Sequence, residues 1–210
     1  MIFNNNSVAG LVALLLAVLT AITCHEVAHG YTAYRLGDPT AKSQGRLTLN
    51  PIKHLDPIGA LLMLVAGFGW AKPVPVNPFY FQGDRTKGMM IVSVAGPLVN
   101  LLISFLCIVI YNLGHGFGQI EVVHLFLLYS ITLNVYLAVF NLIPIPPLDG
   151  SKILAGFLPK AKAYQYLTTM EKYGFMILMV LILFDITDVF MVPIANVILN
   201  IFIAIASILG

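Results

Sequence analysis

Three ionisable side chains early in the chain have the types and spacing of a metal site. The run His25–Glu26–Val27–Ala28–His29 reads H-E-x-x-H. On a helix, residues four apart lie about 40° apart around the axis and about 6 Å apart along it, so both imidazoles share one face. Two imidazoles placed in this way can bind one ion of zinc size, with Glu26 beside a water that the ion activates. The motif therefore predicts metal-dependent hydrolysis in which Glu26 moves the proton.

The surroundings of the motif strengthen this prediction. Glu26 is the one charged residue between Met1 and Tyr34 in an otherwise apolar stretch. A carboxylate in a membrane helix costs several kcal/mol and is retained for a partner, a relay or a metal. With two histidines at ligand spacing, a metal is the economical explanation. The alternative is a protonated glutamate with a structural role.

Asp149 is the best candidate for a third ligand, because catalytic zinc usually takes three protein ligands and a water. It follows the run Pro144–Ile145–Pro146–Pro147, and these prolines are expected to end an apolar helix near Asn141 or Leu142. Irregular backbone at membrane depth is tolerated where it lines protein or a water-filled cavity. The alternative role for Asp149 is the cap of a helix that starts near Ser151.

The composition indicates which kind of fold must position these residues. The chain has 210 residues, of which 59% are hydrophobic and 10% charged, against about 25% charged residues in soluble domains. This excludes a soluble globular enzyme, a disordered chain and a nucleic-acid-binding protein. We therefore expect an all-α polytopic protein, with residues 1–210 forming a single domain embedded in the lipid bilayer. Met1–Ser7 carries no basic residue, so a cleaved signal peptide is not expected.

The charges also predict a topology. Apolar stretches long enough to cross a bilayer are 8–34, 88–113, 122–142 and 189–210, and 173–184 crosses if it borrows residues before Lys172. All eleven Lys and Arg lie in the blocks 35–53, 72–87 and 152–172. The positive-inside rule places these blocks in the cytoplasm and the N-terminus outside.

The apolar stretch Pro57–Ala71 lies between two of the basic blocks. It is therefore expected to re-enter or to lie at the interface rather than to cross, giving five transmembrane helices and a re-entrant or short β element near the site. Six spans is the alternative. Pro73 and Pro75 remove alternating backbone donors, which suits an extended ribbon. We hypothesise that residues near 67–76 pair with an extended substrate by strand addition.

Three further polar residues are candidates for the site. Asn100 and Asn141 lie in otherwise apolar helices, where each either donates a hydrogen bond to an oxyanion or to substrate, or joins two helices. His54 lies just ahead of the re-entrant stretch. It either approaches the metal and gates water, or is an ordinary histidine of an interfacial loop.

Three motifs together resemble those of a known family. H-E-x-x-H at 25–29, A-G-P-x-x-N at Ala95–Asn100 and N-x-x-P-x-P-x-L-D-G at Asn141–Gly150 are similar to the signatures of the site-2 protease family of intramembrane zinc metalloproteases. The resemblance covers a core of residues 8–153, whereas the additional helices within 163–210 match only in being apolar. The stretch 69–78 resembles the compact bacterial and archaeal branch, and no soluble stretch is long enough for a PDZ or paired CBS domains.

The resemblance implies a function and a cofactor. His25, His29 and Asp149 would bind one Zn²⁺ per chain, and Glu26 would act as general base and acid. The reaction would be hydrolysis of peptide bonds in or near transmembrane segments of membrane protein substrates. The protein would lie in the cell membrane of a bacterium or archaeon, with its active site toward the cytoplasm.

Two other classes of function are weighed against this one. A transporter or channel would use the His/Glu/Asp cluster as an ion or proton pathway, but no inverted repeat is evident and the ionisable residues cluster at one depth. A membrane chaperone with a structural zinc would not require Glu26.

Overall fold

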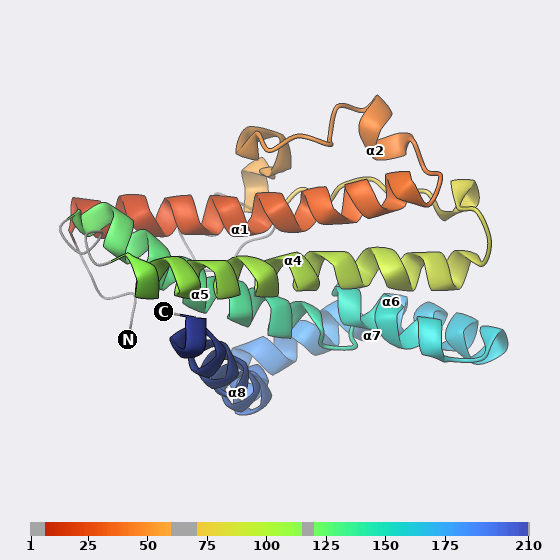
Figure 1. Cartoon of the computed structure of the whole chain (residues 1–210). Helices are drawn as coiled ribbons and strands as arrows, with labels where there is room; N and C mark the ends of the chain where they lie inside the picture. Colours follow the sequence, from red (N-terminus) through yellow and green to blue (C-terminus); the bar gives the residue numbers. More distant parts are fainter. Residues whose placement is uncertain (1–6, 60–70, 115–119, 210) are drawn as a thin grey trace.

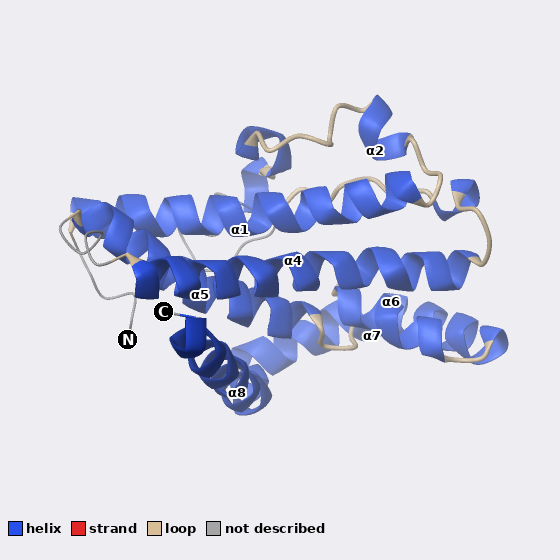
Figure 2. Cartoon of the chain, viewed as in Figure 1, coloured by secondary structure: helices blue, strands red, loops and turns tan. Residues whose placement is uncertain are grey.

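The computed structural model describes residues 7–59, 71–114 and 120–209, and this part of the chain is helical (Figures 1 and 2). The α-helices are α1 (Val8–Arg35), α2 (Thr40–Ser43), α4 (Arg85–Leu113), α5 (Glu121–Asn141), α6 (Asp149–Phe157), α7 (Lys160–Leu183) and α8 (Ile186–Leu209). Short 3₁₀ turns occupy Pro51–His54 and Pro78–Tyr80.

Five of these helices, α1, α4, α5, α7 and α8, are long and apolar enough to cross a membrane. The predicted multi-pass architecture is therefore confirmed. Helix α7 begins at Lys160, so the short apolar stretch 173–184 does extend backwards past Lys172 to reach a spanning length.

The helices α1, α4 and α5 pack against one another and form the centre of the molecule (Figure 1). Ala13 and Ala17 of α1 are fully buried and pack on Tyr129 of α5. Small residues let membrane helices approach closely. Helix α8 packs on α5 through Met191 and Ala195, while α6 lies between α4 and α7. The three central helices thus provide a rigid frame for the residues predicted to do chemistry.

The break between α5 and α6 lies where the prolines predicted it. Helix α5 ends at Asn141, and α6 begins at Asp149 with Leu148 in the cap position. The alternative role of Asp149 as the cap of a helix near Ser151 is therefore wrong, because Asp149 is itself the first helical residue. A Cβ on Gly150 would lie 2.2 Å from the Leu142 carbonyl oxygen, so glycine is needed for this turn to pack on α6.

The stretch from 57 to 71 has its two ends side by side. Leu55 and Ala71 form an isolated antiparallel bridge, and the Lys72 N–H donates to the His54 carbonyl at 2.9 Å. Because Leu55 and Ala71 are paired, both lie on the same side of a membrane, which does not fit the six-span alternative. The described residues contain this bridge but no β-strand, so they do not supply the short β element that was expected. Residues 60–70, on which the re-entrant prediction falls, lie outside the described ranges.

Candidate metal centre

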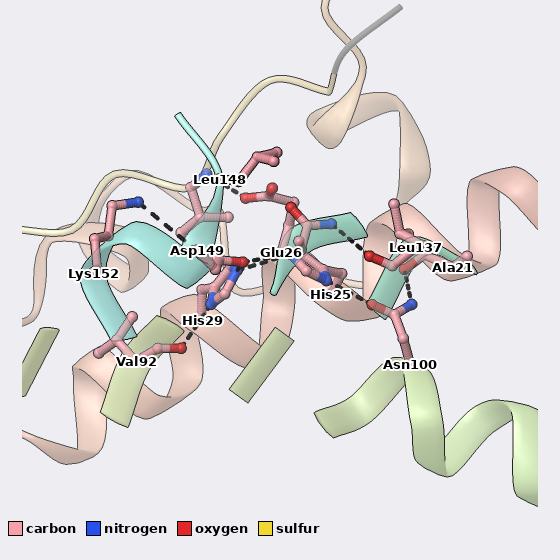
Figure 3. A network of polar contacts seen from close by, with 12 residues as sticks. Ala21, His25, Glu26, His29, Val92, Asn100, Leu137, Leu148, Asp149 and Lys152 are labelled. Atoms are coloured by element: carbon pink, nitrogen blue, oxygen red, sulfur yellow. Dashed lines mark hydrogen bonds and ion pairs between the residues drawn. The ribbon is translucent and has the colours of Figure 1, made fainter. Parts of the chain in front are cut away.

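The structure brings His25, His29 and Asp149 together at the contact of α1 with α6 (Figure 3). The Nε2 atoms of the two histidines are 2.9 Å apart. Asp149 Oδ2 lies 3.2 Å from Nε2 of His25 and 3.1 Å from Nε2 of His29. All three residues are buried, as expected for residues that share a site inside the helix bundle.

The three atoms have the spacing of ligands around one small ion. Tetrahedral zinc with bonds of about 2.0–2.1 Å separates its ligand atoms by about 3.3–3.4 Å. The observed separations of 2.9–3.2 Å differ from this by only a few tenths of an ångström. Two imidazoles and one carboxylate are also a usual donor set for catalytic zinc, which keeps its fourth position for water. The residues therefore fit this metal.

Hydrogen bonds on the far side of each ring set which nitrogen faces the site. His25 Nδ1 lies 2.6 Å from Asn100 Oδ1, and His29 Nδ1 lies 2.8 Å from the Val92 carbonyl oxygen. Both partners accept, so each Nδ1 carries the hydrogen and each Nε2 of a neutral ring presents a lone pair. Two lone pairs and a carboxylate oxygen thus face one another at about 3 Å, which is repulsive unless a cation lies between them.

Asn100 is fixed within the bundle rather than exposed to the site. It is fully buried on α4, and its Nδ2 donates to the Ala21 carbonyl at 3.2 Å and to Asn134 Oδ1 at 2.7 Å. Both amide hydrogens are thereby in use, joining α4 to α1 and α5. These contacts agree with the helix-joining alternative. Contact of Asn100 with substrate stays a prediction.

Replacing Asn100 by Ala is expected to weaken zinc binding by about 10- to 100-fold, the usual effect of removing the partner of a metal-bound histidine. The reason is that His25 would lose the acceptor that holds its ring and tautomer. Competition with a chromogenic chelator measures the affinity. Ser104→Ala is the matched control, since it removes another buried α4–α5 hydrogen bond, to the Ile131 carbonyl at 2.8 Å, without touching a ligand. Equal affinities in the two variants would contradict this role of Asn100.

A cavity of about 330 Å³ lies beside the three clustered residues. Besides them it is lined by residues that include Glu26, Val74, Val76, Ser93, Asn141 and Lys152. Glu26 is half-buried. Asn141, at the end of α5, borders this cavity, and its Nδ2 donates to the Leu137 carbonyl at 2.9 Å. Of the two asparagines predicted from sequence, Asn141 is therefore the one beside the cavity.

Asp149 is the one acidic residue among the three clustered residues. Lys152 Nζ lies 3.9 Å from Asp149 Oδ1. The clustered residues thus include one anionic donor suited to a divalent cation.

The other histidines of the described chain lie apart from this centre. His54 is fully buried, its Nε2 donates to the Thr48 carbonyl at 2.8 Å, and it neither joins the metal cluster nor lines the cavity. Approach to the metal, one of the two alternatives for His54, is therefore not found among the described residues. His124 packs beside Tyr111, with ring centroids 5.6 Å apart.

Two residues that shape the centre had no role in the sequence analysis: Gly96 was noted only as part of the A-G-P-x-x-N motif, and Asn134 was not singled out. A Cβ on Gly96 would lie 2.6 Å from Nε2 of His25 and from Cε1 of His29, so the absent side chain makes room for both rings. Asn134 completes the hydrogen-bond chain behind His25. Asn134 is polar within an apolar helix, and this signal would have been enough to find it.

Comparisons with known proteins agree with this geometry. The model of "Peptidase family M50" matches residues 116–184, which include Asp149. A Bacillus subtilis protein named "Putative zinc metalloprotease YwhC" is 43% identical over 189 residues, covering 87% of this chain and 85% of the relative. The chain belongs to peptidase family M50.

More distant M50 relatives are found in other prokaryotes. "Putative zinc metalloprotease Rip2" of Mycolicibacterium smegmatis is 31% identical over 79% of this chain and 64% of the relative. "Zinc metalloprotease MJ0392" of Methanocaldococcus jannaschii is 27% identical over 76% of this chain and 38% of the relative, so the chain spans well under half of that protein. No solved structure matches the chain significantly. These findings confirm the resemblance to site-2 proteases and a membership in a family of metalloproteases.

Proposed function

We propose that this M50 member is a zinc-dependent intramembrane endopeptidase that binds one Zn²⁺ through His25, His29 and Asp149. The observation that carries the proposal is the arrangement of two imidazole lone pairs and a buried carboxylate oxygen within 2.9–3.2 Å of one another. Such an arrangement is stabilised by a cation bound between the three atoms. The transporter alternative needs a path of ionisable groups, whereas these lie at one end of the α1 span.

Glu26 is the residue proposed to move protons. Bound zinc would supply a Lewis acid that makes water a nucleophile at neutral pH and polarises the scissile carbonyl. Glu26 lines the cavity next to the three ligands, so its carboxylate can take the proton of the attacking water and return it to the leaving amine. Asn141 borders the same cavity and is proposed to donate to the substrate backbone or the oxyanion. Asn100 is proposed to act through His25.

The position of the site supports substrates that are membrane proteins. Two ligands and Glu26 lie on α1, a helix with the length and composition of a span. A helical peptide bond is shielded by its own i to i−4 hydrogen bonds, so a transmembrane substrate must unwind locally before cleavage. Pro73, Val74 and Val76 line the cavity. They support the proposal that an extended substrate pairs with this segment.

The charge pattern supports an orientation and a domain organisation. With the basic blocks in the cytoplasm, the N-terminus lies outside and the metal centre faces the cytoplasmic side. We propose one membrane domain over residues 1–210, with the metal centre in the core of 8–153.

Glu26→Gln is expected to lower the rate of cleavage of a transmembrane peptide by about 10²- to 10⁴-fold, the usual contribution of a general base. Zinc content should stay at one per chain, because Glu26 is not among the clustered ligands. Purified protein in detergent or liposomes, assayed for metal and for peptide products, tests both points. Bound zinc without any Glu26-dependent cleavage would instead support a transporter or a chaperone.

A further inference from the structure

A short extended segment, Ala71–Asn77, passes over α1 at Glu26. Pro73 and Pro75 have no N–H, so Val74 carries the one backbone donor of the Pro–Val–Pro run. That N–H donates to Glu26 Oε2 at 2.6 Å. A charge-assisted hydrogen bond of this kind holds one carboxylate oxygen and leaves Oε1 for the cavity. Within the Pro–Val–Pro run, the one backbone donor is therefore used by Glu26.

Two buried side chains hold the segment on either side of Val74: Asp38, between α1 and α2, and Arg46, just after α2. Asp38 is fully buried, and its Oδ2 accepts from the Asn77 N–H at 2.6 Å. Its other oxygen accepts from the N–H and the hydroxyl of Thr40. Arg46 is 7% exposed, and its Nη2 donates to the Lys72 carbonyl at 2.9 Å. The two residues held in this way, Lys72 and Asn77, lie two residues before Val74 and three residues after it.

The side chain of Val74 is fixed as closely as its backbone. Val74 is 7% exposed. A Cβ on Gly30, the residue after His29, would lie 2.9 Å from Val74 Cγ1 and 2.7 Å from Leu47 Cδ2. The absence of a side chain at Gly30 therefore lets Val74 pack directly on α1, one turn from Glu26.

We propose that Asp38 and Arg46 are positioning residues that set the orientation of the Glu26 carboxylate through the Val74 N–H. The inference rests on the proposed function of Glu26 as the base. It assigns a role to two buried charged groups that lie outside the metal centre. It also implies that a substrate pairing with Pro73–Pro75 receives no N–H from it and must itself donate to carbonyl oxygens.

Amide exchange at Val74 tests the contact without any assay of activity. In protein labelled with ¹⁵N-valine, the Val74 amide should exchange slowly in the wild type and at least about 10-fold faster in Glu26→Ala, because a lost hydrogen bond opens the amide to solvent. Asp38→Asn and Arg46→Met should also speed its exchange. The matched controls are Asp56→Asn, which alters an acid whose hydrogen bonds in the described part of the chain lie within its own turn, and Lys53→Met, which removes an exposed cation. Unchanged exchange in Glu26→Ala would overturn the proposal.

Kinetics test the consequence for the reaction. Asp38→Asn, Arg46→Met and Val74→Pro should each lower kcat by about 10- to 100-fold, as expected for losing a hydrogen bond to a charged group. KM should change by less than about 2-fold and zinc content should be unchanged. Arg46→Lys keeps a donor for the Lys72 carbonyl, so it should restore part of the kcat that Arg46→Met loses.

The outcomes separate this inference from the proposed function. Loss of zinc together with activity in Asp38→Asn and Arg46→Met would show a merely structural role and overturn it. If the wild type has no Glu26-dependent cleavage, the proposed function fails, and the Val74 exchange rates still decide whether Asp38 and Arg46 hold the contact with Glu26.

Discussion

Asp149→Ala is expected to remove zinc and activity together. Asp149 is the one anionic member of the cluster, and its Oδ2 lies within 3.2 Å of both imidazole Nε2 atoms. Two neutral imidazoles on α1 would remain, with no donor from α6. Zinc affinity should fall by more than about 10- to 100-fold, which is the usual effect of losing a residue that hydrogen-bonds a metal ligand. Metal analysis after dialysis and chelator competition measure this loss.

Asp84→Ala is the matched control for that prediction. Asp84 also lies at the start of a helix, where its carboxylate accepts from the N–H groups of Thr86 and Lys87, and Lys160 Nζ lies 3.1 Å away. These contacts hold the pKa of the Asp84 carboxyl below its ordinary value. Its loss should lower the thermal stability, because a helix cap is removed, and should leave zinc binding complete. Undiminished zinc affinity in Asp149→Ala would show that Asp149 is a partner of the histidines and not a ligand.

The sequence predicted the parts of the site that local chemistry determines. The spacing of His25 and His29 places both on one face of any helix, and the scarcity of charge made Glu26 and Asp149 conspicuous. The prolines after Asn141 ended α5 where the structure ends it. Each of these inferences needs only the residues themselves and the cost of a charge or a proline in a membrane helix.

Contacts between segments far apart in the chain were beyond the sequence. His54 lies next to the predicted re-entrant stretch, yet the loop turns its ring inward to the Thr48 carbonyl and away from the metal. The Val74 N–H that donates to Glu26 is a backbone group. The sequence contains no pattern that identifies the partner of a backbone group. The sequence shows Asn100 as a polar residue in an apolar helix. Its hydrogen bond with His25 depends on where α4 crosses α1.

Gly96→Ala is the strongest test of that crossing. The added methyl carbon would lie 2.6 Å from ring atoms of both His25 and His29, far inside van der Waals contact. The rings have little freedom to retreat, because Asn100 and Val92 of the same helix hold their Nδ1 atoms. Zinc affinity should fall by about 10- to 100-fold, and kcat/KM by about 100-fold or more, since a displacement of about 1 Å has that effect on a reacting centre.

Stability separates this clash from general damage to the fold. A Gly→Ala change inside a helix normally stabilises a protein by about 0.4–1 kcal/mol. Any loss of stability in metal-free Gly96→Ala should therefore come from the displaced imidazole rings alone. Gly156→Ala is the matched control, because its methyl group would lie 2.5 Å from Met90 Cβ, a clash against α4 that involves no ligand. It should lower the thermal stability and leave zinc affinity unchanged. Wild-type zinc affinity in both variants would contradict the prediction. It would mean that contacts with α4 do not hold the two imidazoles in the tautomers that present lone pairs to one cation.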